Sequence, residues 1–353
     1  MPSRSRTFVF TLVATLLPLA LMAIGWEIAL RWLEPPLPGN TGSIIRPSPD
    51  AEKQFELIPG STGSVAGART TVNSFGCRDR EYRIPKPQGV VRIVGIGDSL
   101  TFGQGVEEED TFLARLERDL IARGLPVEVI NCGVFGYNVN EEARRFQEVS
   151  ELLEPDIVLI GYELGDPLPN PPLKREAASA SEDSRASHSL LQRHALIDLV
   201  KQSRVISFLA YRYSFLLKKF SLRNWDALYA DGSPLWKNLS DRYAGMAATA
   251  RARKIDVAVA IVPQLSNLDA GYPFKSIHDR VAAMCRAQGM RVVDLLPAFM
   301  GKDGPRLWIH PRDRHPNAEG HRIIADALFE PVAAMVKVRA AIPLGSDSGP
   351  RRQ

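Results

Sequence analysis

Cysteine is scarce in this chain of 353 residues, with only Cys77, Cys132 and Cys285. An odd, low number of cysteines does not indicate a disulfide framework, and no Cys, His or carboxylate spacing is typical of a metal site. Cys132 and Cys285 lie in apolar surroundings, so we expect them to be small residues of a core. The sequence therefore predicts neither a disulfide nor a bound metal.

An excess of either charge is also lacking. The 44 Lys and Arg residues nearly balance the 40 Asp and Glu residues, giving a formal net charge of +4. This balance does not favour a nucleic-acid surface. The glycine-rich stretch over residues 95–105 lacks the Lys of a phosphate-binding loop and the spacing of a dinucleotide fingerprint. We therefore expect no nucleic-acid partner and no cofactor.

A long apolar run is present at the N-terminus. Residues 7–26 carry no charged side chain and follow Arg4 and Arg6. As a helix rising ~1.5 Å per residue, this run spans roughly the 30 Å hydrocarbon core of a bilayer. A cleaved signal peptide is the alternative, but signal cores are usually shorter and no clean cleavage site is evident. We favour a signal anchor over residues 1–33, with the N-terminus cytoplasmic and the rest periplasmic, beyond the inner membrane.

The remainder divides into four parts by composition. Residues 34–70 are rich in Pro, Gly and Ser and predict a linker with little regular structure. A folded domain is expected over residues 71–339, with a helical insert at about residues 167–233 that lacks a strand signal. The insert contains aromatic and basic residues, which favour either packing helices or a surface near lipid headgroups. Residues 340–353 predict a disordered tail.

Apolar strands alternate with amphipathic helices in the folded domain. Strands are expected over residues 90–97, 127–134, 156–163, 256–263 and 291–296, and helices over residues 111–124, 140–154, 240–254, 276–289 and 317–338. This alternation predicts a parallel sheet covered on both faces. The fold class is therefore α/β: a three-layer α/β/α sandwich with a five-stranded, flavodoxin-like parallel sheet, preceded by one transmembrane helix.

Polar motifs follow the predicted strands, where parallel sheets bind their ligands. Ser99 follows the first strand in "GIGDSLTFGQG", and Gly136 follows the second in "GVFGYN". A serine hydroxyl needs a base to attack an ester, and a carboxylate usually orients that base. His315 and Asp313, in "RDRHPNAEGH", are the candidates, with His310 as a rival base. The alternative for Ser99 is an ordinary helix cap.

Taken together and in this order, the motifs resemble the SGNH, or GDSL, hydrolase superfamily from about residue 72 to residue 332. The resemblance implies that Ser99 is the nucleophile, His315 the base and Asp313 its partner. It also implies an oxyanion hole built from the backbone N–H groups of Ser99 and Gly136. The stretch "VNSFGCRDREY" further resembles a membrane-anchored subgroup often associated with bacterial surface polysaccharides.

Two positions depart from the family pattern. The third block normally supplies an Asn side chain to the oxyanion, but "GYELGD" has Gly165 at that place. Loss of such a donor costs about 10²–10³ in rate, unless a side chain such as Asn138 or Asn170 replaces it. The family also usually has Asp-x-x-His, whereas here the spacing is Asp-x-His. Proteins that resemble the alginate O-acetylation machinery share this shorter spacing.

The resemblance and the topology together imply a serine acyl-ester hydrolase that acts on an O-acylated, chiefly O-acetylated, glycan outside the cytoplasm. Two alternatives stay open. The same acyl-enzyme could pass its acyl group to a sugar hydroxyl, as a polysaccharide O-acyltransferase. A degenerate domain could instead bind glycan or serve as a scaffold without catalysis. A lysophospholipase is a weaker alternative, suggested by the aromatic and basic insert.

Overall fold

The computed structural model describes residues 4–33, 39–169 and 225–341, together with residues 203, 205, 206, 209 and 213. The chain forms two compact units, Met1–Leu37 with Lys174–Trp225, and Pro38–Leu173 with Asp226–Gln353. Most of the predicted helical insert, and the predicted tail from residue 342, lie outside the described residues.

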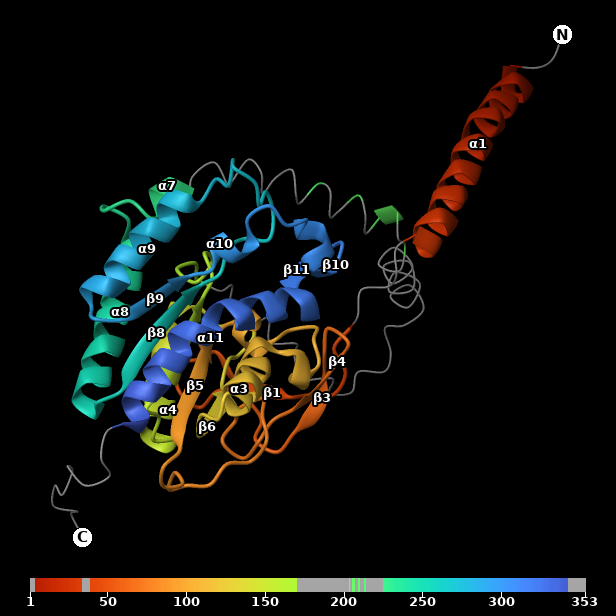
Figure 1. Cartoon of the computed structure of the whole chain (residues 1–353). Coiled ribbons are helices and arrows are strands. Elements are labelled where there is room, and N and C mark those ends of the chain that lie inside the picture. Colours follow the sequence, from red (N-terminus) through yellow and green to blue (C-terminus); the bar gives the residue numbers. More distant parts are fainter. Residues whose placement is uncertain are drawn as a thin grey trace. The chain divides into compact units, whose positions relative to one another are not determined.

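The first unit contains α1 (Arg4–Leu33), a single helix over the apolar N-terminal run (Figure 1). The 23 residues Phe10–Trp32 are long and apolar enough to cross a membrane, with a mean hydropathy of 1.9 over the most apolar 18 residues of this span. Large apolar side chains such as Phe10 and Leu17 are exposed along this helix. By length and composition, α1 is thus a candidate membrane span, as an anchor or as a signal sequence.

The second unit is built on a five-stranded parallel sheet in the order β6-β5-β7-β8-β9 (Figure 1). Its strands are β5 (Val91–Gly97), β6 (Val127–Asn131), β7 (Ile157–Tyr162), β8 (Asp256–Ile261) and β9 (Arg291–Asp294). Every residue of β5 and β7 is buried, which explains their nearly continuous apolar sequences. The predicted flavodoxin-like sheet is confirmed.

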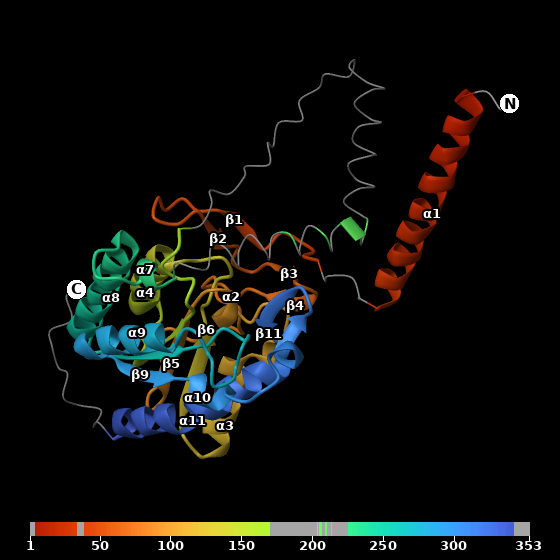
Figure 2. The same cartoon turned by 90° about the horizontal axis from the view of Figure 1, so that it is seen from above.

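Helices cover both faces of this sheet (Figure 2). One face carries α3 (Phe112–Ala122) and α11 (Ala318–Ala340), and the other carries α4 (Val139–Leu152), α8 (Pro234–Arg253) and α9 (Lys275–Ala287). Four of these five helices begin at a polar N-cap residue: Thr111, Asn138, Ser233 or Asn317. The side chain of each cap accepts a hydrogen bond from a backbone N–H group that is otherwise free in the first turn.

Short elements complete the second unit. An antiparallel ribbon precedes α11 and consists of β10 (Trp308–His310) and β11 (Asp313–Pro316). The remaining helical turns are α2 (Ser99–Phe102), α7 (Trp225–Leu228), α10 (Leu296–Phe299), and the 3₁₀ turns Glu108–Asp110 and Gly304–Leu307. The register pairs Gly97 of β5 with Gly161 of β7, so the loops that follow these two strands begin side by side.

The expectation of an irregular linker over residues 34–70 is wrong for most of that stretch. Two antiparallel strand pairs form there: β1 (Ile45–Pro47) with β2 (Phe55–Leu57), and β3 (Thr62–Val65) with β4 (Ala68–Thr71). We call residues 39–72 the N-terminal lobe. These strands are only three or four residues long. The Gly, Pro and Ser residues around them predict turns, and the few apolar positions between the turns are too short a pattern to predict strands.

The N-terminal lobe shares a small core with the central domain. Its buried members are Ile44, Phe55, Leu57, Val65, Val72, Phe102, Val134 and Tyr137. Phe102 is the last residue of α2, and Val134 and Tyr137 belong to the loop after β6. The lobe therefore supports the two segments that carry Ser99 and Gly136, and tertiary packing rather than local pattern decides its structure.

A disulfide joins Cys77 to Cys132, which corrects the expectation that no cysteine is paired. The two residues are 55 positions apart in the sequence, and the odd, low number of cysteines gave no indication that they pair. The neighbouring Arg78 is fully buried and donates to the carbonyl oxygens of Phe102 and Gly103 at 3.0 and 2.6 Å. Cys285 is buried and unpaired, as predicted.

Candidate active site

Ser99 is the first residue of α2, directly after the buried strand β5. Gly97 has a φ of 148°, and a Cβ there would lie 2.7 Å from the carbonyl oxygen of Gly161. Only glycine fits both this backbone conformation and this close approach. Asp98 then caps α2 by accepting a hydrogen bond from the N–H of Leu100 at 2.9 Å. The tight turn aims Ser99 away from the strand.

His315 and Asp313 lie on β11 two residues apart. Alternate residues of a strand share one face, so the Asp-x-His spacing places the carboxylate beside the imidazole without a further turn. Asp313 Oδ1 lies 2.5 Å from His315 Nδ1, and His315 Nε2 lies 2.7 Å from Ser99 Oγ. The structure therefore brings Ser99, His315 and Asp313 into one continuous series of hydrogen bonds.

The ionisation of this series follows from its contacts. Burial disfavours the imidazolium of His315, but its hydrogen bond with Asp313 and the charges of Asp313, Asp98 and Glu163 outweigh burial and raise its pKa. Burial likewise opposes ionisation of Asp313, but the hydrogen bond and charge of His315 lower its pKa overall. Asp313 is thus an anion at neutral pH, and it favours the proton on Nδ1 of His315.

Gln104 is a site residue that the sequence analysis missed. Its Nε2 lies 3.4 Å from Asp313 Oδ2 and 3.3 Å from His315 Nδ1. Its backbone N–H donates to the carbonyl oxygen of Ser99 at 3.0 Å. Gln104 therefore links the end of the serine turn to β11. Its position inside "GDSLTFGQG" was the available signal.

Gly136 lies in the loop after β6 with a φ of 77°, a left-handed conformation that favours glycine. The same loop passes close to α2, because a Cβ on Gly133 would lie 2.5 Å from the backbone N of Phe102. Gly136 therefore follows β6, the strand next to β5, in a loop that passes beside the serine turn, and the sequence predicted that it follows this strand. Its role in an oxyanion hole stays a prediction.

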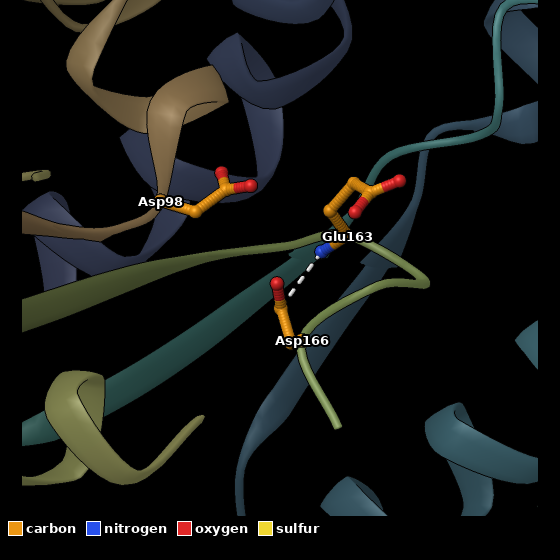
Figure 3. A group of neighbouring side chains, drawn as sticks. All are labelled: Asp98, Glu163 and Asp166. Carbon is orange, nitrogen blue, oxygen red and sulfur yellow. Dashed lines mark hydrogen bonds between the residues drawn. The ribbon is translucent and has the colours of Figure 1, made fainter. Parts of the chain in front are cut away.

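Four carboxyl groups gather beside Ser99. Asp98, Glu163 and Asp166 each have a carboxyl oxygen within 4.8 Å of the others (Figure 3). Glu142 of α4 is fully buried, and Asp98 and Glu163 act on it by charge repulsion. We call these four residues the carboxyl cluster. Within the described residues, none of the four pairs with Lys or Arg.

The spacing of Asp98, Glu163 and Asp166 would admit a cation, which sequence analysis did not predict because Asp98 is distant from the others in the chain. Their oxygens are mostly engaged, however, as acceptors from protein groups. Asp98 accepts from Leu100 N–H, Glu163 from Gly165 N–H, and Asp166 from Glu163 N–H, each at 2.9 Å. These contacts describe a hydrogen-bonded group, and they do not require a metal.

Protonation relieves the charge in the carboxyl cluster. Burial is the main cause of a raised pKa in all four residues, and repulsion between carboxylates adds to it for Glu142, Glu163 and Asp166. The pKa of Glu163 rises to about 7. Both carboxyl oxygens of Glu142 and Oδ1 of Asp166 are buried without a hydrogen-bond partner among the described residues. Neutral acids tolerate such surroundings better than carboxylates do.

The residues considered as substitutes for the missing Asn are not brought together with Ser99 by any described contact. The Asn138 side chain caps α4, where its oxygen accepts from the N–H of Asn140 at 2.9 Å. Asn170 lies outside the described residues. His310, the rival base, is buried, and its Nδ1 accepts from the N–H of Arg312 at 3.1 Å.

Residues 96–323, more than half of the chain, match the sequence model of the GDSL-like Lipase/Acylhydrolase family. The chain belongs to this family and is a serine ester hydrolase of the SGNH/GDSL type. None of the curated proteins matches it.

Several solved structures are similar in fold. TesA is 15% identical and superimposes with a TM-score of 0.44, over 69% of this chain and 99% of that chain. The esterase EstA from Pseudoalteromonas sp. is 15% identical, with a TM-score of 0.41 over 70% and 98% of the two chains. Axe2, an acetylxylan esterase from Geobacillus stearothermophilus, is 15% identical, with a TM-score of 0.42 over 68% and 93%.

Proposed function

We propose that this protein hydrolyses the acyl esters of an O-acetylated glycan outside the cytoplasm, with Ser99, His315 and Asp313 as its catalytic residues. One observation carries the catalytic part of the proposal. Ser99 Oγ, His315 and Asp313 form an unbroken hydrogen-bonded series of 2.7 and 2.5 Å, although Ser99 and His315 are 216 residues apart. Such a series is what activates a serine hydroxyl at neutral pH.

The reaction follows from these positions. Ser99 Oγ attacks the acyl carbon while its proton moves to Nε2 of His315, and the carbonyl electron pair becomes an oxyanion. The oxyanion collapses, and the leaving sugar oxygen takes the proton from His315. Water then attacks the acyl-enzyme with the same base, releasing acetate and restoring Ser99. Asp313 keeps His315 in the required tautomer and stabilises its cation.

The oxyanion requires donors that are already in place before the attack. The backbone N–H groups of Ser99 and Gly136 fill this role in the proposal. They come from the loops after β5 and β6, which are neighbours in the sheet. Replacing Gly136 with a larger residue would strain its left-handed backbone and displace its N–H.

The location and the substrate class rest on three features. The apolar helix α1 is long enough to cross a membrane, and the Cys77–Cys132 disulfide is typical of oxidising compartments. The stretch over residues 72–82 resembles a membrane-anchored subgroup associated with surface polysaccharides. Together they support a periplasmic enzyme anchored in the inner membrane, with an acylated glycan as its substrate.

The first test uses the full chain in detergent micelles. Hydrolysis of p-nitrophenyl acetate is compared for wild type, Ser99→Ala and His315→Ala, with Ser43→Ala as a matched serine control in the N-terminal lobe. We expect turnover by wild type and the control, and background rates for the other two. Acetate release from acetylated glycans is then measured against a phospholipid ester. Preferential release from the lipid would replace the glycan with a lysophospholipid substrate.

The second candidate function is O-acyltransfer to a polysaccharide. The Asp-x-His spacing of β11, shared with proteins that resemble the alginate O-acetylation machinery, favours it. A transferase would gain acetate on an added polysaccharide from an acyl donor, with little hydrolysis in water. A degenerate, glycan-binding domain is disfavoured by the intact Ser99–His315 hydrogen bond, and glycan binding without any ester turnover would revive it.

A further inference from the structure

The carboxyl group of Glu163 fills the space that a side chain on Gly165 would take. A Cβ on Gly165 would lie 2.5 Å from Glu163 Oε2, and the N–H of Gly165 donates to the same oxygen at 2.9 Å. The other oxygen, Oε1, accepts from Nε2 of Gln264. Two donors therefore hold this carboxyl in one orientation beside Gly165.

This carboxyl also lies beside the nucleophile turn. A carboxyl oxygen of Glu163 is within 4.8 Å of one of Asp98 (Figure 3), and Asp98 Oδ2 is 3.5 Å from Ser99 Oγ. Glu163 also acts through its charge on His315. Glu163 follows β7, whose end pairs with the end of β5, so the sheet itself brings this carboxyl to the reacting serine.

Gly165 leaves the site without a side-chain donor at its position, while the attack of Ser99 creates a negatively charged oxygen that needs donors. An ionised carboxylate can only accept hydrogen bonds, but a neutral carboxylic acid has one O–H to donate. Each Glu163 oxygen accepts one hydrogen bond from the described residues and retains a second hydrogen-bonding site. A protonated Glu163 could therefore donate without breaking its contacts to Gly165 and Gln264.

We propose that Glu163, as a neutral acid, is a catalytic residue that donates a hydrogen bond to the oxyanion formed when Ser99 attacks the ester. This inference rests on the proposed serine mechanism. No proton is transferred from Glu163: the carbonyl electron pair moves to oxygen, the Ser99 proton goes to His315, and the Glu163 O–H only shares its hydrogen. When the intermediate collapses, the hydrogen bond weakens and Glu163 keeps its proton.

The surroundings of Glu163 favour this protonation state. It faces Asp98 from the α2 turn, Glu142 from α4, Asp166 from its own loop, His315 from β11 and the neutral Gln264 after β8. Burial and repulsion from Asp98 raise its pKa to about 7, against the opposing effects of the Gly165 N–H and of His315. Below about pH 7 the neutral acid dominates, and above it the carboxylate would repel the oxyanion.

The mechanism then needs two groups in opposite states. His315 must be neutral to accept the Ser99 proton, which favours high pH, whereas Glu163 must keep its proton, which favours low pH. Activity should therefore pass through a maximum and fall on the alkaline side. The alkaline decline is the signature of Glu163, because the relay of His315 and Asp313 predicts only a rise with pH.

The test measures kcat and KM for p-nitrophenyl acetate from pH 5 to 9, using the full chain in micelles and the isosbestic wavelength of the phenol. Glu163→Ala should lower kcat about 10²-fold near pH 6 with little change in KM. Glu163→Gln keeps a donor at all pH values, so it should stay active and lose the alkaline decline. The double variant Glu163→Gly with Gly165→Asn removes the acid and supplies an amide donor, and should recover activity relative to Glu163→Ala, also without the decline.

Two controls separate this inference from its rivals. Glu142→Gln removes a carboxyl of the same cluster and should keep the alkaline decline. If wild type is active while Glu163→Ala retains its kcat, or if Glu163→Gln still declines at high pH, the inference is wrong and the serine mechanism survives. If wild type is as inactive as Ser99→Ala, both fail. Loss of activity with EDTA and its return with Ca²⁺ or Mg²⁺ would assign the role to a cation and overturn the inference.

Discussion

Asp313 and Glu163 both act on His315 through their charge, yet their surroundings differ. Asp313 has a hydrogen-bonded imidazole as its partner, and its pKa is lowered. Glu163 has other carboxyls as neighbours, and burial together with repulsion from Asp98 raises its pKa to about 7. At pH 7 the same functional group is thus an anion on the β11 side of the site and about half neutral acid on the β7 side. Burial and the neighbouring charged groups, rather than the residue type, decide which chemistry a carboxyl can perform.

Removing the Asp313 charge should have the largest effect on activity. Asp313→Asn keeps the size of the side chain but loses the anion that favours the proton on His315 Nδ1. We expect kcat to fall about 10⁴-fold, and the acidic limb of kcat/KM to move to lower pH because Asp313 raises the pKa of His315. Asp303→Asn, at an exposed site paired with Arg306, is the matched control. Activity within tenfold of wild type would contradict the assignment.

Opening the disulfide tests how much the covalent link between Cys77 and Cys132, which follows β6, contributes to the stability of the second unit. The double variant Cys77→Ser with Cys132→Ser should lower the free energy of unfolding by about 2–4 kcal/mol. Its thermal midpoint should fall, and its sensitivity to reductant should vanish. Cys285→Ala keeps the disulfide and should keep that sensitivity. A double variant as stable as wild type would show that the disulfide contributes nothing to the stability of the folded protein.

Glu142→Gln tests the carboxyl cluster through stability: it should make the folded protein more stable than wild type as the pH rises. An acid with a raised pKa in the folded state loses stability as the pH rises above its unfolded pKa, since the unfolded chain releases the proton first. Glu142 is fully buried without a hydrogen-bond partner among the described residues, so its neutral amide analogue avoids this loss. The gain in stability of the variant over wild type should therefore be larger at pH 8 than at pH 5. Thermal unfolding at both pH values measures it, and an equal difference at both would refute it.

Gln104→Ala should have the smallest effect. Its Nε2 donates to the Asp313 carboxylate over a long 3.4 Å, so a weak hydrogen bond of about 1 kcal/mol would be lost. We expect kcat to fall roughly fivefold with an unchanged KM. Gln147→Ala, at an exposed position of α4, provides the control. A loss as large as that of Asp313→Asn would mean that Gln104 holds the whole relay in place.

The sequence predicted those parts of the molecule that local pattern decides. Apolar runs marked all five strands of the sheet, and the motifs marked Ser99, His315 and Asp313 as candidates, but the strand β11 that carries the last two was not predicted. It missed the N-terminal lobe, the Cys77–Cys132 pair and the carboxyl cluster. Each of these depends on contacts between distant segments: Asp98 and Glu163, for example, meet only because β5 and β7 are neighbours. The pKa of Glu163 depends on burial, which no short motif reports.

The N-terminal lobe also determines where a soluble fragment of this enzyme can begin. Phe102 and Val134 belong to the segments that carry Ser99 and Gly136, and the lobe buries them together with Phe55 and Leu57. A fragment that started at residue 71, where composition places the domain boundary, would expose this apolar surface to water. Such a fragment would invite aggregation, whereas one that starts at residue 39 keeps the surface covered.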